Sequence, residues 1–235
     1  MAELISIPLW LSAPHPCNYL QQQTAQSVLL ANDLFAPSTA LYSALVQQGF
    51  RRSGNQLYAP RCANCSACLS SRIAVQDFQL NRQQKRCNQR NQHTQVKIKA
   101  AAFDPRHYDL YRRYQLARHT DKLAEISAQS YREFMCSDWC DTWFVEFSIN
   151  TQLIAVAVVD VLTTGLSAVY TFFDPDFDCY SLGTYAVLWQ IEQAKQLGLD
   201  FVYLGYWIEE CRKMRYKSQF RPLQVYQDQQ WQVLI

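Results

Sequence analysis

The pattern of apolar and polar positions predicts a regular α+β succession between about residues 96 and 226. Three strand-like apolar stretches follow one another, and their connections at 150–152 and 163–165 are short enough only for antiparallel hairpins. Apolar positions at helical spacing flank these strands. The expected elements are strand 96–103, helices 106–119 and 127–136, strands 142–149, 153–162 and 166–173, helix 181–197, strand 201–205, helix 209–217 and strand 223–226.

This order of elements resembles the GNAT acyltransferase fold. In that fold the fourth and fifth strands diverge, and the gap holds the acyl carrier beside free N–H groups at the start of the next helix. We therefore expect an α+β protein whose GNAT-like acyl-transfer half spans residues 94–235. Residues 1–93 are expected to form a smaller, cysteine-containing α+β region packed on that half.

The first half of the chain is less regular. Residues 38–49 are expected to form a helix, and residues 56–59 and 71–75 short strands. A further helix is expected at 81–91, where Cys87 is the only apolar residue of any size, so this helix does not belong to a core. Its basic residues share one face. They are Arg82, Lys85, Arg86 and Arg90.

Composition excludes several classes of protein. Of the 235 residues 49% are hydrophobic and 18% are charged, which suits a packed core and argues against a disordered chain. No stretch reaches the ~20 apolar residues that a membrane span needs. The first eleven residues contain Glu3 and Pro8 and carry no basic residue, unlike a signal peptide. We therefore expect a cytoplasmic protein.

The net charge of +2 conceals a polarised distribution. Residues 51–99 contain ten Lys or Arg against one acid, so this segment carries +9 and the rest of the chain −7. A second basic cluster lies at residues 212–221. Concentrated positive charge is typical of proteins that bind a polyanion, above all nucleic acid. The alternative is a solvated basic face without a partner.

Three of the nine cysteines form a C-x2-C-x2-C run, Cys62, Cys65 and Cys68. Thiolates at this spacing converge on one point, which suits a zinc ion or an iron–sulfur cluster. A tetrahedral site needs a fourth ligand, for which Cys17 is one candidate. The alternative is a tight loop of thiols that pack as small hydrophobic groups.

Several strings of the sequence, taken together, resemble one family. They are PCNYL (16–20), GFRRSG (49–54), YAPRCANCSAC (58–68), AVYTFFDP (168–175), SLGTYA (181–186), YLGYWI (203–208) and KMRYKSQFRP (213–222), with Tyr111, Tyr114, Arg118 and His119. They resemble the N-end-rule aminoacyl-tRNA–protein transferases, and the chain length is similar to that of the short bacterial aspartate/glutamate leucyltransferases. The resemblance covers about residues 14–226.

The resemblance implies a function. Members of the family use an aminoacyl-tRNA to add one amino acid to the N-terminus of a protein and so mark it for degradation. The short bacterial branch is associated with leucine, transferred to N-terminal Asp or Glu, and the eukaryotic relatives transfer arginine. Those relatives carry paired cysteines linked to an iron–sulfur cluster, whereas this chain has a single Cys17 at the first place.

The reaction needs little acid–base catalysis. The tRNA ester is already activated, and an α-amine with a pKa of about 7.7–8.0 is appreciably neutral in the cell. Orientation of the reactants is worth roughly 7–11 kcal/mol. We therefore expect aminoacyl-tRNA as cosubstrate, proteins with N-terminal Asp or Glu as acceptors, and no cofactor in the chemistry itself.

Candidate catalytic residues follow from these motifs. Tyr170, Phe172 and Tyr206 are expected to wall an aminoacyl or adenosine pocket, with core packing as the alternative. Asp174 is expected to hold the acceptor ammonium or a ribose, and it would serve a turn beside Pro175 equally well.

Candidate binding residues lie on the same half of the chain. Ser181 and Gly183 open the long helix, where an aminoacyl ester or the tRNA 3′ end would bind, although Ser181 also suits an ordinary N-cap. A second group would bind an acidic acceptor side chain or phosphate. Its members are Arg112, His119, Lys213 and Lys217.

Two other classes of function remain open from the sequence. A CoA-dependent N-acetyltransferase would explain the element order and leave the basic segment and the cysteines unexplained. A metal-stabilised nucleic-acid binder would explain the cysteines and the charge and leave the acyltransferase-like half unexplained. Transfer of arginine in place of leucine is the alternative within the family.

Overall fold

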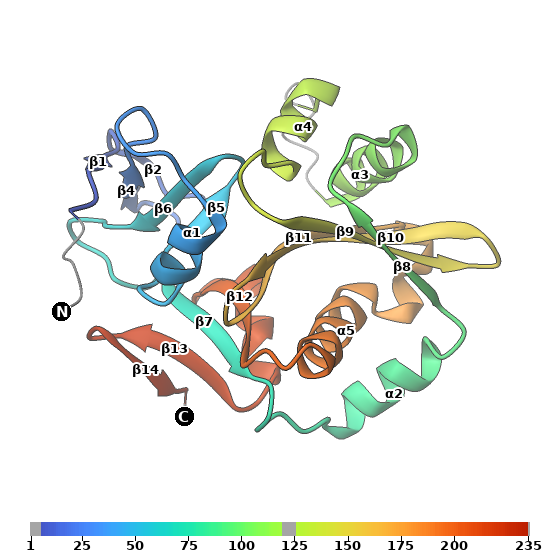
Figure 1. The fold of residues 1–235 in the computed structure, drawn as a ribbon. Helices are drawn as coiled ribbons and strands as arrows, with labels where there is room; N and C mark the ends of the chain where they lie inside the picture. Colours follow the sequence, from blue (N-terminus) through green and yellow to red (C-terminus); the bar gives the residue numbers. More distant parts are fainter. Residues whose placement is uncertain (1–5, 119–125, 235) are drawn as a thin grey trace.

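An eight-stranded mixed sheet organises the computed structural model, which describes residues 6–118 and 126–234 (Figure 1). Its strand order is β14-β13-β7-β12-β11-β10-β9-β8. The strands are β7 (Leu69–Ala74), β8 (Gln95–Ala100), β9 (Thr142–Ile149), β10 (Gln152–Leu162), β11 (Gly165–Phe173), β12 (Phe201–Trp207), β13 (Leu223–Gln227) and β14 (Gln230–Val233). β11 and β12 run parallel, and the other neighbouring pairs are antiparallel.

Helices cover both faces of this sheet (Figure 1). One face carries α1 (Thr39–Val46), α3 (Pro105–Arg118) and α4 (Ala128–Met135), and the other carries α5 (Leu182–Gln196) with α2 (Arg82–Arg90) beside it. Short helical turns follow β11 and β12. They are η2 (Pro175–Tyr180), α6 (Arg212–Arg215) and η3 (Tyr216–Gln219). None of the described helices is long and apolar enough to cross a membrane.

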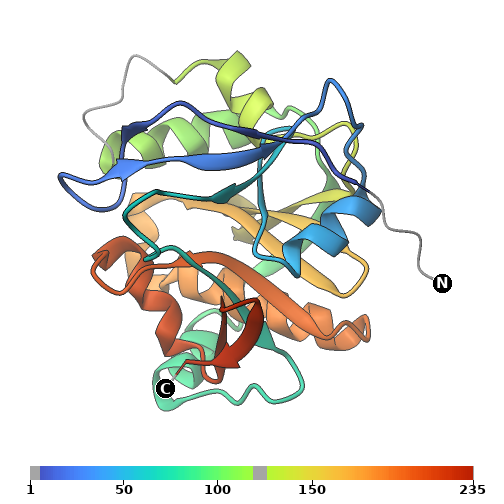
Figure 2. The same cartoon turned by 90° about the vertical axis from the view of Figure 1, so that its left-hand side faces the viewer.

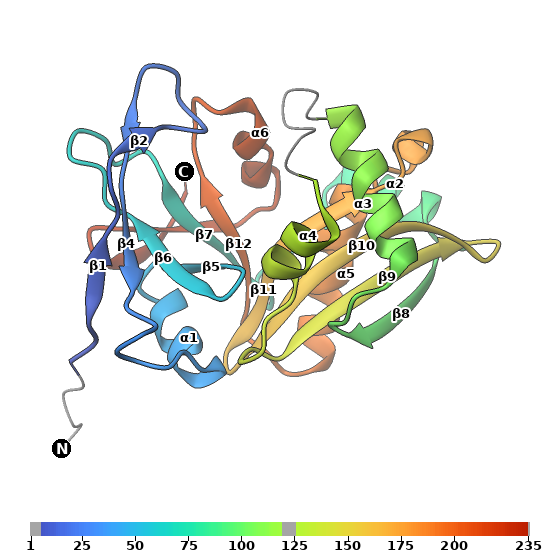
Figure 3. The same ribbon diagram turned by 90° about the horizontal axis from the view of Figure 1, so that it is seen from above.

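A smaller sheet is built from the first sixty residues. Its strand order is β1-β4-β6-β5, and a two-stranded ribbon of β2 and β3 extends from it. Seen from above, this sheet and α1 lie towards the β7 and β12 end of the large sheet, and α3 and α4 lie towards its β8 and β9 end (Figure 3). The strands are β1 (Leu9–Leu11), β2 (His15–Pro16), β3 (Thr24–Ala25), β4 (Ser27–Leu30), β5 (Arg51–Ser53) and β6 (Gln56–Pro60).

The mixed α and β composition and the element order predicted for residues 96–226 are confirmed. The predicted hairpins β9–β10 and β10–β11 are antiparallel, and α2 agrees closely with the expected helix, with Asn81 as its N-cap. The expected basic helix 209–217 is wrong in extent, because only Arg212–Arg215 is α-helical and a 3-10 turn follows. Strands β1 to β5 and β14 were not predicted.

Strand β7 joins the two halves of the chain. It pairs with β12 on one side and with β13 on the other, so an N-terminal segment is an interior strand of the large sheet. Figure 2 shows β7 beside the red C-terminal strands. The division of the chain near residue 93 stays a prediction.

Strands β11 and β12 separate soon after they begin. Their parallel register covers Gly165↔Phe201, Leu166↔Val202 and Ser167↔Tyr203, and ends there. The register between β12 and β7 shifts between Tyr203 and Gly205, and Gly205 has φ +78. An irregularity of this kind bends a strand locally. The bend lies where β12 parts from β11.

Replacing Gly165 by Ala is expected to destabilise the protein where the two strands meet. A Cβ at this position would lie 2.3 Å from the Phe201 carbonyl oxygen, so β12 would have to move. Overpacking of this kind typically costs about 1–3 kcal/mol. Denaturant unfolding followed by tryptophan fluorescence measures the loss. Gly183→Ala is the matched control, because its Cβ meets Phe173 at an ordinary 3.5 Å; an equal loss in both variants would contradict the prediction.

Candidate active site and nucleic-acid interface

The buried guanidinium of Arg51 occupies the point where β11 and β12 diverge. Its Nη2 donates to the Ala168 carbonyl of β11 at 2.6 Å, and Nη1 lies 3.5 Å from the Tyr203 carbonyl of β12. Gly205 lies against this group, and its φ of +78 is a backbone conformation that favours glycine. Arg51 is therefore bonded to both strands at the point where their own ladder ends. Sequence reasoning missed it, although it belongs to the GFRRSG string.

Tyr206 lies beyond the divergence and contacts the N-terminal region. Its hydroxyl donates to the carbonyls of Gly49 at 3.1 Å and Tyr58 at 3.3 Å, and burial raises its pKa well above the ordinary value. Lys217 Nζ donates to the Tyr206 carbonyl. The Tyr206 side chain and backbone thus connect β12 to the N-terminal sheet and to η3.

Tyr170 and Phe172 belong to a different group of aromatic side chains. Phe172 is fully buried and packs against Tyr111 and Tyr131, and the Tyr170 hydroxyl accepts a hydrogen bond from Gln115 Nε2 at 3.0 Å. These contacts come from α3 and α4. The structure therefore places the expected pocket residues in two places, with Tyr170 and Phe172 under α3 and α4 and Tyr206 against the N-terminal region.

Asp174 ends β11 and begins η2. It is 1% exposed, its Oδ1 accepts from the Asp176 N–H at 3.2 Å, and its Oδ2 accepts from Arg113 Nη1 at 2.7 Å. Both carboxylate oxygens thus have partners within the chain. The arrangement is that of a capped turn, one of the two interpretations that the sequence left open. Arg113 is a partner that sequence reasoning missed.

The remaining bases of α3 are at the surface. Arg112 is exposed, with its guanidinium 5.9 Å from the centre of the Tyr108 ring. Arg118 is paired with Asp178 at 3.0 Å. His119, a predicted binding residue, lies outside the described residues. Of the predicted bases near the C-terminus, Lys213 is exposed and Lys217 is buried.

A hollow of about 320 Å³ lies between α2 and the start of α5. Arg86, Arg90, Ser181 and Thr184 are among its lining residues. Arg90 donates to the Cys179 carbonyl and lies 3.4 Å from Ser181 Oγ, so it bridges α2 to the turn before α5. Ser181 has φ 53 and does not cap the helix with its side chain. The ordinary N-cap, which was the alternative interpretation of Ser181, is therefore absent, and the first N–H groups of α5 receive no side-chain cap from Ser181.

The exposed face of α2 carries the predicted basic residues next to this hollow. Arg82, Lys85, Arg86 and Arg90 are all exposed, while Gln84 and Cys87 are buried against the body of the protein. A second hollow of about 460 Å³, between the β5–β6 hairpin and α4, is lined by the carboxylate of Glu133. Because Glu133 is negatively charged, this second hollow is less suited to a polyanion than the arginine-lined hollow beside α2.

The four cysteines proposed as metal ligands lie near one another in the N-terminal region. The N–H groups of Tyr19 and Leu20 point at Cys17 Sγ, both at 3.4 Å, and a β-bridge joins Cys62 to Cys65. Burial and the neighbouring thiols raise the pKa of Cys68 to about 12. In the described part of the chain no three of these sulfurs come within 4.8 Å of one another. This arrangement does not fit a closed tetrahedral site, so we assign no chemistry to a metal here.

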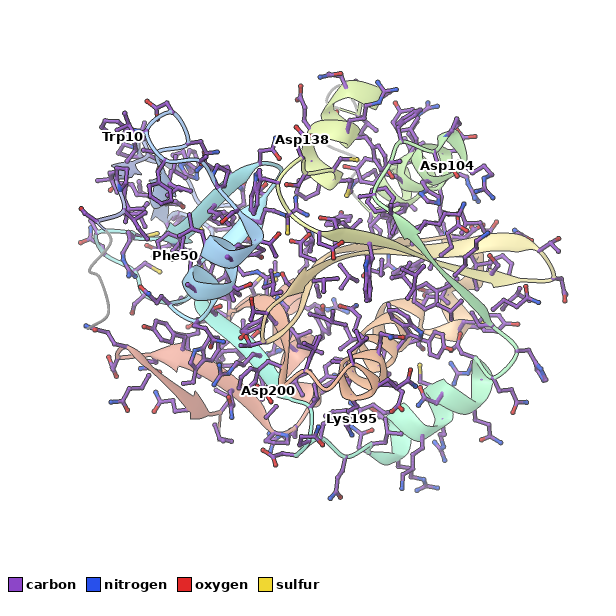
Figure 4. The ribbon with its side chains drawn as sticks, in the orientation of Figure 1. Trp10, Phe50, Asp104, Asp138, Lys195 and Asp200 are labelled. Atoms are coloured by element: carbon purple, nitrogen blue, oxygen red, sulfur yellow. The ribbon has the colours of Figure 1, made fainter. Side chains whose placement is uncertain are left out.

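Asp104, His107 and Glu146 do bring their ligand atoms within 4.8 Å of one another. Arg106 pairs with Asp104 at 2.6 Å and lowers the pKa of that carboxyl through its hydrogen bond, while Lys99 pairs with Glu146 at 2.7 Å. Both acids therefore already have cationic partners. Figure 4 shows Asp104 on the opposite side of the molecule from Trp10. We interpret this group as an ion-pair network that fastens α3 to the sheet.

Comparison with known proteins shows to which family the chain belongs. The family model for the C terminus of arginine-tRNA-protein transferase matches residues 106–227, and the model for its N terminus matches residues 15–86. An aspartate/glutamate leucyltransferase of Pseudomonas aeruginosa is 47% identical over 236 residues, covering 100% of both chains. The chain belongs to this transferase family. A leucyltransferase of Nitrosococcus oceani is also 47% identical, over 100% of this chain and 99% of its own.

Membership of the family confirms the resemblance found in the motifs and makes the chain an aminoacyltransferase. The two family models together span the segments that carry the motifs, including the KMRYKSQFRP string, and the N-terminal model reaches residue 86 within α2. Among solved structures, the C-terminal domain of a putative lysylphosphatidylglycerol synthetase from Agrobacterium fabrum is similar with a TM-score of 0.44 and 13% identity. The match covers 71% of this chain and 51% of that one.

Proposed function

We propose that this protein transfers leucine from Leu-tRNA to the α-amine of proteins that begin with Asp or Glu. The proposal rests on the 47% identity, over the full length of both chains, to proteins named aspartate/glutamate leucyltransferase. The product would be a degradation signal of the N-end-rule pathway, formed in the cytoplasm. Donor and acceptor are its substrates, and the chemistry requires no cofactor.

We place the transfer step near the divergence of β11 and β12. The proposed fold of residues 94–235 is GNAT-like, and this divergence corresponds to the gap that holds the acyl carrier in that fold. Arg51 takes up the Ala168 and Tyr203 carbonyls there, and N–H groups that lose their strand partner would be available to a ligand. Oriented N–H groups would stabilise the oxyanion that forms when the α-amine attacks the ester. As the new amide C–N bond forms, the ester C–O bond breaks and the tRNA leaves. The amine loses a proton to water, and the departing tRNA oxygen takes up a proton from water to become a free hydroxyl.

We propose that the exposed face of α2 and the neighbouring hollow bind the tRNA. The hollow combines guanidinium groups with the N-terminal end of α5, a 15-residue helix whose first N–H groups favour an anion. Ser181 and Gly183 belong to this end of α5 and would lie close to the 3′ end. Arg112, His119 and Lys213 remain proposed contacts to phosphate or to the acceptor.

One assay tests the activity. Labelled Leu-tRNA and a peptide with N-terminal Asp are expected to yield labelled peptide, and no incorporation with an active tRNA control would overturn the proposal. Arg-tRNA in the same assay tests the alternative donor. Calorimetric titration with acetyl-CoA tests the acetyltransferase alternative, for which binding at micromolar concentration would be the supporting result.

Removing charge from α2 is expected to flatten the salt dependence of tRNA binding. Each lost phosphate contact lowers the slope of log K against log salt by about 0.7–0.9. The triple variant Arg82→Gln, Lys85→Gln, Arg86→Gln leaves Arg90, which bridges to Cys179, in place. We therefore expect the slope to fall by roughly 2 to 3 and the KM for Leu-tRNA to rise.

The rival location is the second basic cluster. A matched triple variant at Arg212, Lys213 and Arg215, which are also exposed, tests it in the same filter-binding titration. If the slope is unchanged in the α2 variant and reduced in the second variant, the tRNA-binding site lies at α6 and not at α2.

A further inference from the structure

Arg51 is a buried cation without a carboxylate partner. It is 5% exposed, and among the residues that the structure describes it forms no ion pair. Its hydrogen bonds go to two backbone carbonyls, at Ala168 and Tyr203, and its Nε donates to none of the described atoms. Burial of an unpaired charge is costly, so such a group needs a compensating anion.

The next residue provides an internal comparison. Arg52 is 4% exposed, almost the same as Arg51, but its guanidinium is held by both oxygens of Asp160, at 2.8 and 2.6 Å. That pair is satisfied within the fold. The two adjacent arginines are almost equally buried, but within residues 6–118 and 126–234 a carboxylate pairs with Arg52 and none pairs with Arg51.

Lys217 is a second buried cation in the same place. It is 5% exposed, and its Nζ donates to the Tyr206 carbonyl and to Met214 Sδ. Burial, followed by the positive charge of Arg51, lowers the pKa of Lys217 to about 7. In the described part of the chain Lys217 also has no carboxylate partner. Two buried cations therefore act on each other without an anion between them.

Three acidic groups near this pair, Tyr58, Tyr206 and Cys68, are neutral at cellular pH. Burial raises the pKa of Tyr58 and of Tyr206, and burial with neighbouring thiols raises that of Cys68 to about 12. The phenols and the Cys68 thiol therefore supply no negative charge. Cys211 and the Tyr216 ring complete the surroundings of Lys217.

We propose that Arg51 and Lys217 bind the side-chain carboxylate of the acceptor's N-terminal Asp or Glu. The inference rests on the proposed function and specifies how the acceptor is selected. A guanidinium is the best group for the purpose, because its planar fork matches a carboxylate and it does not lose its charge. A carboxylate at the divergence of β11 and β12 would place the adjoining α-amine beside the acyl ester.

Substitution of either cation tests the selection. Arg51→Gln and Lys217→Gln are each expected to lower kcat/KM for Asp- and Glu-initiated peptides by about 10-fold or more, a charged hydrogen bond being worth ~1.5–3 kcal/mol. For an otherwise identical peptide with N-terminal Asn, kcat/KM should fall much less, so the ratio of kcat/KM for the Asp peptide to that for the Asn peptide decreases. The KM for Leu-tRNA stays unchanged. Lys97→Gln, an exposed base on β8, is the control and leaves the ratio unchanged.

A second measurement uses the unmodified protein and does not depend on the folding of a variant. A bound carboxylate favours the charged form of Lys217. Binding of the Asp peptide at pH 8 should therefore take up nearly one more proton than binding of the Asn peptide. Any proton change at the α-amine is the same for both peptides and cancels in this difference. Calorimetry in two buffers of different ionisation enthalpy measures this difference.

The outcomes separate the inference from the proposed function. Loss of activity in equal proportion for Asp and Asn peptides, or equal proton uptake for both, would overturn the carboxylate site and leave leucyl transfer intact. Absence of transfer from Leu-tRNA to any peptide by the unmodified protein would overturn the proposed function instead. Weaker Leu-tRNA binding in Arg51→Gln would assign Arg51 to the donor and also overturn the inference.

Discussion

Replacing Asp160 by Ala is expected to lower the free energy of unfolding by about 3–5 kcal/mol. The side chains of Arg52 and Asp160 are both 0% exposed, and Asp160 Oδ1 also accepts from Thr142 Oγ1 at 2.7 Å. Removal of the carboxylate would leave a fully buried guanidinium with the Gly54 carbonyl at 2.8 Å as its remaining acceptor. Such an uncompensated charge is far more costly than the loss of one hydrogen bond.

Urea denaturation followed by circular dichroism measures this loss. The control is Asp178→Ala, which removes the partner of Arg118 from an exposed pair and should cost less than ~1 kcal/mol. The double variant Arg52→Leu, Asp160→Leu removes both charges and should recover much of the stability. Equal losses for the buried and the exposed pair would contradict the account of Arg52 as a satisfied structural arginine.

The stability of the protein is expected to rise with pH above 7 because of Lys217. Its pKa is about 7 in the folded protein against 10.5 when unfolded, so between these values the unfolded chain binds more protons than the folded one. Protonated Lys217 thus destabilises the fold below pH 7, and the penalty is relieved as pH rises towards 10.5. Between pH 7 and 10.5 this effect raises the free energy of unfolding by roughly 4 kcal/mol, and about 2 kcal/mol of the rise falls between pH 7 and 9.

The measurement compares wild type with Lys217→Met by denaturant unfolding from pH 7 to 9. The difference in unfolding free energy between the two should change by about 2 kcal/mol over this range, with the variant the more stable at pH 7. Lys97→Met, which alters a lysine in water, should show no such change. Parallel pH profiles for wild type and Lys217→Met would show that the buried ammonium does not titrate there. Burial raises the pKa of Cys68 and Cys140, so their effect on stability near pH 9 is shared by wild type and variant and cancels in the difference.

Periodicity predicted the central elements of residues 142–197 because each has a long apolar pattern of one kind. Helix α5 and strands β9 to β11 bury continuous apolar faces, so their positions are visible in the sequence. The strands of the N-terminal sheet are only two to five residues long, and β1 is exposed throughout. Short strands of this kind are defined by their partners and leave little pattern along the chain.

The candidate site was predictable only in part. The bases of α2 were placed correctly on an exposed face, because a helix whose only sizeable apolar residue is Cys87 has to lie at the surface. Arg51 was counted with them as part of the basic segment, since sequence does not distinguish a buried arginine from a solvated one. Tyr170 and Tyr206 were expected to line one pocket, but β11 and β12 diverge. Tyr170 therefore lies under α3 and α4, and Tyr206 lies against the N-terminal region.

The place of β7 in the large sheet has a consequence for biosynthesis. β7 leaves the ribosome well before β12 and β13, yet it lies between them and pairs with both. The nascent N-terminal half must therefore hold an interior strand open at both edges until the last third of the chain arrives. Unpaired edges of this kind invite pairing with other chains. The sheet, and with it the site beside β12, can form only if β7 does not pair with another chain before β12 and β13 have been synthesised.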